Sequence, residues 1–263
     1  GRSHAMQRSY EAIQCVAELE TPVLIQGQTG TGKELVARAI HARSLRKDKP
    51  FIAVNCGALP ETLLESELFG HVRGAFTGAV SEKIGLFHEA GGGTLFLDEI
   101  TETSPATQVK LLRALQEGEI RRVGSTKDEK IDVRVLAASN KNIEEEVRAG
   151  KFREDLYYRL SVFPISLPPL SKREDDILLL ADHFLEIHRK KSRKKLSGFT
   201  RSAQEALLRH SWPGNVRELA NTVERAVILA KDEMITEKTL PLFAASPAGD
   251  RSSRDTYLRD VSP

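Results

Sequence analysis

A glycine-rich stretch with one lysine carries the clearest chemical signal in the sequence. It lies between an apolar segment, Pro22–Gln26, which predicts a buried strand, and an amphipathic segment, Leu35–His41, which predicts a helix. In such a turn the backbone N–H groups and the helix dipole favour phosphate, and a lysine adds a positive charge. The alternative, a loop that merely turns the chain, is less favoured by this context. The predicted phosphate-binding residues are Gly27, Gln28, Thr29, Gly30, Thr31, Gly32, Lys33 and Glu34.

The last of these residues departs from the generic phosphate-loop pattern. The spacing of Gly27, Gly32 and Lys33 matches GxxxxGK, but Glu34 stands where Ser or Thr is usual. A hydroxyl at that position normally touches Mg²⁺, so the generic pattern is only partly met.

Two consecutive carboxylates form the second chemical signal. Asp98 and Glu99 follow Thr94–Leu97, a short segment of strand character. Asp98 would hold Mg²⁺, directly or through water, and Glu99 would polarise the attacking water. Such a pair alone is usually a solvated strand end, but it lies about 65 residues after Lys33, as a second NTPase motif would. Together the two motifs predict hydrolysis of a nucleoside triphosphate.

Polar residues also end two further predicted strands. Asn55 closes the segment Pro50–Cys56, and Asn140 follows Ile131–Ala138. In open α/β sheets ligands bind beyond the carboxyl ends of the strands, so both residues fall where chemistry is expected. Asn140 would sense the γ-phosphate or cap the following helix, and the sequence leaves both interpretations open.

Three arginines are candidates for contacts with phosphate. Either Arg153 or Arg159 would serve as an arginine finger, or as an ordinary ion-pair partner of the carboxylates at 154 and 155. Arg217 lies in the first turn of a predicted helix, where a cation is unfavourable unless it meets an anion. A phosphate is one such anion, and the neighbouring Glu218 is another.

Composition and patterning set the broader frame. The chain has 263 residues, 39 basic and 37 acidic side chains and a net charge of +2, so bulk charge indicates no particular polyanion. Cys15 and Cys56 have no metal-binding spacing and indicate reduced thiols in a cytoplasmic protein. Apolar runs are far shorter than the roughly 20 residues of a membrane span, and no secretory signal is present.

Residues 1–6 are typical of an expression-vector remnant, and residues 7–168 predict an α/β nucleotide-binding unit. After the prolines near 164–169 the strand signals stop, and residues 169–243 predict a helical unit. The basic run His188–Lys195 is better explained as a solvated helix end than as a nucleic-acid site. Residues 244–263 are polar and predict a disordered linker, so we expect the chain to be part of a longer protein.

A glycine-hinged segment with a small apolar tip is the last unusual feature. Gly74 and Gly78 permit sharp turns around Ala75, Phe76 and Thr77. An aromatic tip on such hinges suits burial in a partner. From physics alone, burial of Phe76 in the protein's own core is about as favourable.

These stretches together resemble the AAA+ domain of bacterial sigma-54-dependent transcriptional activators, the NtrC-like enhancer-binding proteins. The similarity runs from about Thr21 to about Ala230, and its most specific part is the GAFTGA sequence, Gly74–Ala79. The other matching stretches are Glu65–Gly70, Gly92–Ile100, Phe152–Leu160 and Trp212–Leu219.

The resemblance implies an AAA+ P-loop NTPase with a parallel-sheet α/β core followed by a smaller all-helical lid. It implies that ATP and Mg²⁺ are cofactors and that the active form is a homo-oligomeric ring, a hexamer or heptamer. The implied partner is sigma-54 of RNA polymerase, and DNA binding would belong to a C-terminal helix-turn-helix domain absent from this chain. The residues implied to grip sigma-54 are Gly74, Ala75, Phe76, Thr77, Gly78 and Ala79.

The resemblance also implies individual roles. Asn55 would hydrogen-bond Glu99, Asn140 would be sensor I, and Arg217 would be sensor II. Arg153 and Arg159 would be offered to the ATP of a neighbouring subunit. In this family a Glu follows the phosphate-loop lysine, so Glu34 is expected.

Two positions depart from the family pattern. Gln28 stands where the family often has Glu, which we expect to matter little. Ser171 replaces an Arg that usually follows Pro-Pro-Leu, which puts any lid contact by that arginine in doubt.

Three other functions are less favoured by the sequence. The first is another AAA+ machine, such as a protein unfoldase or helicase loader, which the GAFTGA sequence disfavours. The second is a nucleotide-gated module without hydrolysis, which Lys33, Asp98 and Glu99 disfavour. The third, a self-sufficient DNA binder, lacks a recognisable helix-turn-helix after Ala230.

Overall fold

The computed structural model describes residues 1–192 and 194–242. Its contacts divide the chain into two compact units. The first contains Gly1–Leu180 and Trp212–Leu219, and the second contains Ala181–Ser211 and the described residues from Ala220 onward. The boundary predicted at residue 168 stays a prediction, and the predicted linker 244–263 lies outside the described residues.

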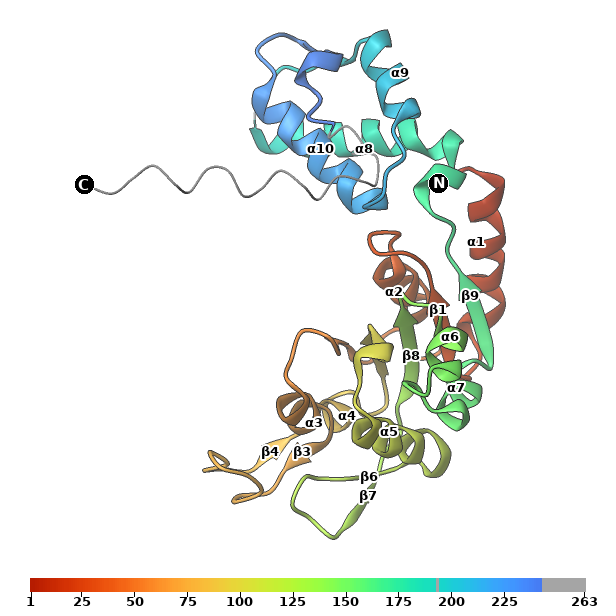
Figure 1. Cartoon of the computed structure of the whole chain (residues 1–263), viewed down its shortest axis with the longest axis vertical. Coiled ribbons are helices and arrows are strands. Elements are labelled where there is room, and N and C mark those ends of the chain that lie inside the picture. The colour runs from red at the N-terminus through yellow and green to blue at the C-terminus, as the bar shows by residue number, and fades with distance from the viewer. Residues whose placement is uncertain (193, 243–263) are drawn as a thin grey trace, which may run out of the picture. The chain divides into compact units, whose positions relative to one another are not determined.

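The centre of the first unit is a five-stranded parallel sheet (Figure 1). Its strands, in spatial order, are β2 (Phe51–Asn55), β5 (Thr94–Asp98), β8 (Arg134–Ser139), β1 (Val23–Gln26) and β9 (Phe163–Ser166). The sequence analysis did not predict β9, because it contains Pro164. Proline cannot donate to a strand ladder and is tolerated at sheet edges, and β9 is an edge strand paired with β1.

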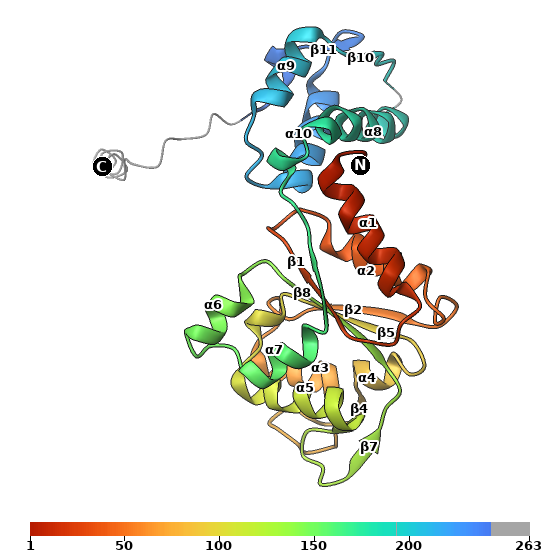
Figure 2. The same cartoon turned by 90° about the vertical axis from the view of Figure 1, so that its right-hand side faces the viewer.

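Helices cover both faces of this sheet, as Figure 2 shows. On one face lie α1 (His4–Ala17) and α2 (Lys33–Ala42), which pack on Ile25 of β1. The neighbouring residue of the same strand, Leu24, points to the opposite face of the sheet and packs in a second apolar cluster. That cluster includes residues of α3 (Glu61–Phe69), α5 (Pro105–Glu117), α6 (Ile143–Arg148) and α7 (Glu154–Leu160). Alternating side chains therefore build a three-layer α/β unit, as predicted.

The first helix, α1, starts close to the beginning of the chain. It begins at His4, inside the stretch that resembles a vector remnant, and Met6 is buried. Just before it, the Ser3 hydroxyl donates to Asp176 Oδ2 at 2.7 Å. These residues therefore pack as part of the first unit.

Two short antiparallel hairpins extend from the α/β unit. The first pairs β3 (Gly70–His71) with β4 (Lys83–Ile84), and the second pairs β6 (Glu119–Arg121) with β7 (Asp128–Lys130). Backbone bonds join them, because Val123 N donates to Gly70 O at 2.9 Å and Val72 N donates to Val123 O at 3.1 Å. A four-residue helix, α4 (Leu86–Glu89), follows the first hairpin.

The second unit is largely helical. It contains α9 (Arg201–Arg209) and the later parts of α8 (Glu174–Ser192) and α10 (Asn215–Leu229). A pair of two-residue strands, β10 (Gly198–Phe199) and β11 (Met234–Ile235), was not predicted.

In the basic run of this unit, Lys194 has a structural role. Its Nζ donates to the carbonyls of Val227, Ile228 and Ala230, which lie at the C-terminal end of α10, where carbonyls lack partners within the helix.

None of the described helices is both long and apolar enough to span a membrane.

Candidate nucleotide site and glycine-hinged loop

The carboxyl ends of the five strands bring the predicted polar residues to one edge of the sheet. Asn55 of β2 lies in register with Asp98 of β5, and Gln26 of β1 lies in register with Ser139, which precedes Asn140. The phosphate loop starts directly after Gln26. The edge that the sequence analysis selected is therefore where these residues meet.

Close packing requires the glycines of the phosphate loop. Gly30 has φ of +79°, and a Cβ there would lie 2.2 Å from the carbonyl oxygen of Gly214. A Cβ at Gly27 would lie 3.0 Å from Leu167 Cβ. Backbone conformation and space both exclude larger residues, so this loop is held firmly.

Lys33 lies buried at the start of α2. Its Nζ donates to the carbonyls of Gly27 at 2.8 Å and Gln28 at 3.4 Å. Burial lowers the pKa of Lys33, while the charges of Asp98 and Glu99 oppose that shift. Burial likewise raises the pKa of Asp98, and Lys33 opposes it. The cation and the carboxylate therefore interact electrostatically at this edge of the sheet.

Glu34 points along the surface of α2. Its Oε1 accepts from Arg38 Nε at 2.9 Å and Nη2 at 2.7 Å, and half of its side chain is exposed. The residue at the position that usually carries a Mg²⁺-binding hydroxyl is thus ion-paired with an arginine one helical turn further along α2.

Glu99 is held in an uncommon backbone conformation, with φ of +54°. Its N–H donates to Asp98 Oδ1 at 3.0 Å. A Cβ at Gly57 would lie 2.7 Å from Glu99 Oε2 and 3.4 Å from Asn55 Oδ1, so both side chains meet at this glycine. Asn55 Oδ1 accepts from Gly57 N at 2.8 Å. A direct bond between Asn55 and Glu99 stays a prediction.

Asn140 faces the phosphate loop. Its Nδ2 donates to Thr29 Oγ1 at 3.3 Å. Its Oδ1 is buried and has no hydrogen-bond partner among the described residues. A buried amide oxygen without a partner is uncommon and marks a place where a ligand group or water would be bound.

The start of α10 lies against the same loop. The N–H groups of Val216 and Arg217 donate to Gly30 O at 3.0 and 3.3 Å. The Arg217 side chain is exposed, and its charge contributes to the lowered pKa of Lys33. Arg217 thus lies beside the phosphate loop, where the resemblance implied it.

Asn215, two residues before Arg217, is a site residue that the sequence analysis missed. It is fully buried at φ of +53°. Its Nδ2 donates to Gln28 Oε1 at 3.2 Å and to Thr29 O at 3.0 Å, and its Oδ1 accepts from Leu170 N at 2.8 Å. Gln28 therefore has a defined partner, which the sequence did not indicate. The Gly-Asn pair before a helix was the available signal, because Asn tolerates this backbone region.

Arg173 is a second missed residue. It is 5% exposed, and it donates from Nε to Pro168 O at 2.9 Å and from Nη2 to Thr31 O at 3.3 Å. Ser171 stands where the family usually has an arginine, but Arg173, two positions later, contacts the phosphate loop.

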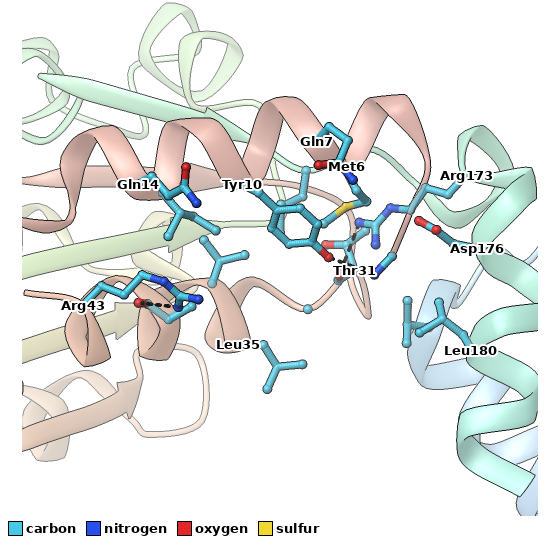
Figure 3. A pocket seen from close by; sticks show the side chains of 17 residues that line it. Met6, Gln7, Tyr10, Gln14, Thr31, Leu35, Arg43, Arg173, Asp176 and Leu180 are labelled. Atoms are coloured by element: carbon cyan, nitrogen blue, oxygen red, sulfur yellow. Dashed lines mark hydrogen bonds between the residues drawn. The ribbon is translucent and has the colours of Figure 1, made fainter. Parts of the chain in front are cut away.

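A pocket of about 580 Å³ adjoins the loop at Thr31 and Gly32. Figure 3 shows its lining, in which Met6 and Tyr10 of α1 face Leu35 of α2. Polar side chains lie at both ends, Arg173 and Asp176 at one and Gln14 and Arg43 at the other. A mainly apolar pocket of this size with a few polar groups suits a nucleoside.

The two finger candidates lie on and beside α7. Arg153 pairs with Asp155, at 3.0 Å from Nε and 2.7 Å from Nη2. Arg159 donates from Nε and Nη2 to Leu115 O at 3.1 and 2.9 Å. Both side chains are exposed, so both are open to a second molecule.

The GAFTGA segment forms the loop of the β3–β4 hairpin. Gly74 and Gly78 have φ of +82° and +101°, and Gly74 N donates to Ala79 O at 2.9 Å. Phe76 is only partly buried, and its ring meets the His71 ring edge-on at 5.0 Å. Thr77 at the tip is exposed, whereas Ala79 is buried. Phe76 is therefore not enclosed in the core of its own chain.

The base of this loop is fixed by His71. Its Nε2 donates to Ser81 O at 3.0 Å, and its Nδ1 lies 2.8 Å from the Ser66 hydroxyl. One imidazole thus connects α3, the hairpin and the aromatic tip.

Comparison with known proteins places these features in a family context. The family described as the sigma-54 interaction domain matches residues 1–166, and an AAA+ ATPase lid domain matches residues 171–256. The transcriptional regulatory protein ZraR of Salmonella typhimurium is 55% identical over 100% of this chain and 59% of its own length. The Nif-specific regulatory protein of Azotobacter vinelandii is 53% identical over 92% of this chain and 46% of its own length.

A solved structure is also similar. NtrX from Brucella abortus, crystallised in complex with ADP, superposes with a TM-score of 0.85 and 40% sequence identity, over 92% of this chain and 54% of that protein. The chain spans between about half and three fifths of the length of these relatives.

Proposed function

The chain belongs to the sigma-54 interaction domain family of AAA+ P-loop NTPases. From this premise we propose that it is the ATP-hydrolysing part of a sigma-54-dependent transcriptional activator. In this proposal it works as a ring of identical copies, a hexamer or heptamer, and remodels the sigma-54 RNA polymerase through its GAFTGA loop so that promoter DNA opens. Such a partner places the protein in the cytoplasm, and DNA binding belongs to a segment outside this chain.

The observation that carries the proposal is the convergence of Lys33, Asp98 and Glu99 at the carboxyl edge of the sheet. The loop amides and Lys33 would bind the β- and γ-phosphates, with Lys33 Nζ exchanging the Gly27 carbonyl for phosphate oxygens. The apolar pocket at Tyr10 and Leu35 would hold the adenosine.

The donor set fits a bound Mg²⁺, since Asp98 and Glu99 place two carboxylates at the end of β5, where both interact electrostatically with Lys33. Mg²⁺ held there would neutralise developing phosphate charge. Glu99 would orient water and accept its proton, while Asn140, whose Oδ1 is buried without a partner among the described residues, would contact the nucleotide.

The exposed arginines support a site shared between copies. Arg153 and Arg159 emerge from the α5–α7 side of the unit, and neither side chain is buried. In a ring they would reach the ATP of the next copy, where a finger is worth roughly 10³–10⁵ in rate. Arg159→Ala is therefore expected to abolish turnover with nearly unchanged nucleotide binding.

The partly exposed Phe76 supports the loop assignment. Its ring meets the His71 ring, and Thr77 beside it is exposed. Phe76 would insert into sigma-54 when the nucleotide state changes, because an aromatic anchor supplies much of an interface's binding energy.

The test joins chemistry to partner binding. Phosphate release by Glu99→Gln is expected to be at background while ATP binding persists, and Glu11→Gln, at an exposed carboxylate of α1, serves as the matched control. Thr77→Ala is expected to keep ATPase activity and to lose transition-state-analogue-dependent binding to sigma-54. Brisk turnover by Glu99→Gln, or equal sigma-54 capture by Thr77→Ala and its parent, would overturn the proposal.

A further inference from the structure

We infer that Gln108 is a positioning residue that couples the chain's own catalytic strand end to the arginine that the chain offers to the next copy. This inference rests on the proposed function, in which hydrolysis occurs between copies. Gln108 lies in the first turns of α5, and its side-chain hydrogen bonds go to residues other than Lys33 and Asp98.

The amide of Gln108 joins three separate backbone positions. It is 0% exposed, its Nε2 donates to Thr103 O at 2.9 Å and to Lys151 O at 3.1 Å, and its Oε1 accepts from Arg153 N at 2.9 Å. Both N–H groups and the carbonyl are thus used. Loss of this side chain would leave one buried backbone group, at Thr103, and two partly buried ones, at Lys151 and Arg153, without this partner.

The first of these segments starts at the catalytic glutamate. After Glu99 the chain forms one tight 3-10 turn, Ile100–Glu102, in which Glu102 N donates to Glu99 O at 2.9 Å. Thr103 follows, with its N–H and its hydroxyl both donating to Ile100 O, at 3.2 and 2.7 Å. Ile100 and Thr103 are buried, so a displacement of the backbone at Glu99 would also displace the Thr103 carbonyl.

The second segment carries the arginine. Gln108 holds the backbone on both sides of Phe152, a buried residue, because it binds Lys151 O and Arg153 N. Arg153 is the residue before α7, and its extended backbone sets the direction in which its exposed side chain leaves. Gln108 therefore fixes the root of this arginine without contacting its guanidinium.

The far end of the same helix contacts the other candidate. Leu115 O, in the last turn of α5, accepts from Arg159 Nε and Nη2. One rigid helix thus contacts both arginines, and its first turn is bonded to the segment that follows Glu99. A displacement of that segment would move α5 and both arginines together.

A purely structural role for Gln108 makes a different prediction from a positioning role. If the amide only satisfies buried groups, its loss harms every copy equally, wherever that copy sits. If it positions the offered arginine, its loss harms only the site of the next copy.

Mixed rings of the 263-residue chain separate these roles. A donor copy carries Lys33→Ala, so its own site is inactive but its arginines are intact. An acceptor copy carries Arg153→Ala and Arg159→Ala, so it cannot complete the site of the next copy, while its own intact site is completed only by the arginines of a donor. Only acceptor sites beside donors hydrolyse ATP in the mixture. The test substitution is Gln108→Met, which is nearly isosteric but apolar. It is introduced either into the donor or into the acceptor, never into both.

In the donor, Gln108→Met is expected to lower kcat at least about tenfold, a fraction of the roughly 10³–10⁵ that a finger supplies, with KM for ATP unchanged. In the acceptor the same substitution is expected to leave kcat within about twofold, because that copy's arginines are already removed. Gln116→Met, on the exposed face of α5, is the matched control and is expected to be neutral in both placements.

A second variant guards against loss of folding. Gln108→Glu keeps the size of the side chain and, when its buried carboxyl is protonated, one donor and one acceptor. In the donor its kcat, relative to the unmodified mixture, is expected to recover as the pH is lowered from alkaline to mildly acidic. Thermal unfolding and ATP binding are measured for every variant.

Equal losses in donor and acceptor, or no loss in the donor, would overturn the inference while the unmodified mixture still hydrolyses ATP. An unmodified mixture that does not hydrolyse ATP would overturn the shared site itself, and the inference with it. The two failures are therefore distinguishable.

Discussion

Two glycine-hinged loops in the same unit use glycine for different reasons. In the phosphate loop, a Cβ at Gly30 would collide with a carbonyl oxygen at 2.2 Å, and the backbone also has a positive φ. In the GAFTGA loop, Gly74 and Gly78 have positive φ, but a Cβ at either would have no described atom within 4 Å. The first loop is tightly packed, whereas the second is free of packing around its hinges.

The contacts around the two loops show the same contrast. Buried Asn215 and Arg173 hold the phosphate loop from two different segments. The backbone bonds of the GAFTGA loop are short-range ones, such as Gly74 N to Ala79 O and Ala79 N to Phe76 O, and its aromatic ring contacts His71. A rigid loop suits binding of an anion in fixed geometry, and a loosely packed one suits a segment that changes position.

The largest effect is expected for Gly30→Ala. The added methyl meets backbone atoms of Gly214, which cannot rotate away, and the positive φ adds strain of about 1–2 kcal/mol. We expect ATP affinity to fall by more than about a hundredfold and the unfolding temperature to drop. Titration with a fluorescent ATP analogue and a thermal melt measure both, and parental affinity in this variant would contradict the tight packing.

Asn215→Gly is expected to have the next largest effect. Glycine accepts the φ of +53°, so the substitution removes only the side-chain bonds to Gln28, Thr29 and Leu170. Each buried group left unpaired costs about 1–3 kcal/mol, which predicts roughly tenfold weaker ATP binding and lower stability in urea.

Gln28→Glu provides the matched control for Asn215→Gly. A carboxylate still accepts from Asn215 Nδ2, so ATP affinity is expected to stay within about twofold. Equal affinities for Asn215→Gly and its parent would show that the contact does not hold the loop.

Gly78→Ala is expected to act on the other loop alone. No described atom lies near the added methyl, so only the backbone strain of about 1–2 kcal/mol remains. Phosphate release is expected within about twofold of the parent, whereas nucleotide-dependent capture of sigma-54 should weaken. A variant that loses both activities together would remove the distinction between the loops.

The smallest effect concerns thiol reactivity, which reports packing without changing function. Burial, with the charges of Asp98 and Glu99, raises the pKa of Cys56 to about 12, while Cys15 is exposed. In mildly alkaline buffer the folded protein is therefore expected to label once, and twice in denaturant. Thr77→Cys should add a fast-reacting thiol at the GAFTGA loop; rapid labelling of Cys56 would contradict the closed packing beside the nucleotide site.

Local sequence patterns predicted much of this architecture. Strand, turn and helix around Lys33 follow from apolar spacing over a few residues. The strand β9 was missed because it contains Pro164, which disfavours a strand. Proline is tolerated there because β9 lies at the edge of the sheet, and that position follows only from the assembled sheet. The family resemblance, confirmed by the comparisons, supplied roles that periodicity does not contain.

The missed residues share a physical property. Asn215 bonds to Thr29 across 186 positions, and Gln108 bonds to Arg153 across 45. Each is a polar side chain whose partners are backbone groups of distant segments, and a single sequence carries no periodic signal for such pairs. Arg173 was missed for the same reason, since its bond to Thr31 spans 142 positions.

The central claim is that ATP is hydrolysed where two copies meet, and specific ATPase activity across a protein dilution series tests it most directly. The account predicts that activity per chain rises with concentration to a plateau and falls toward zero on dilution, while ATP binding persists. Constant activity per chain at every dilution would contradict it, because a single copy would then supply every group that the reaction needs.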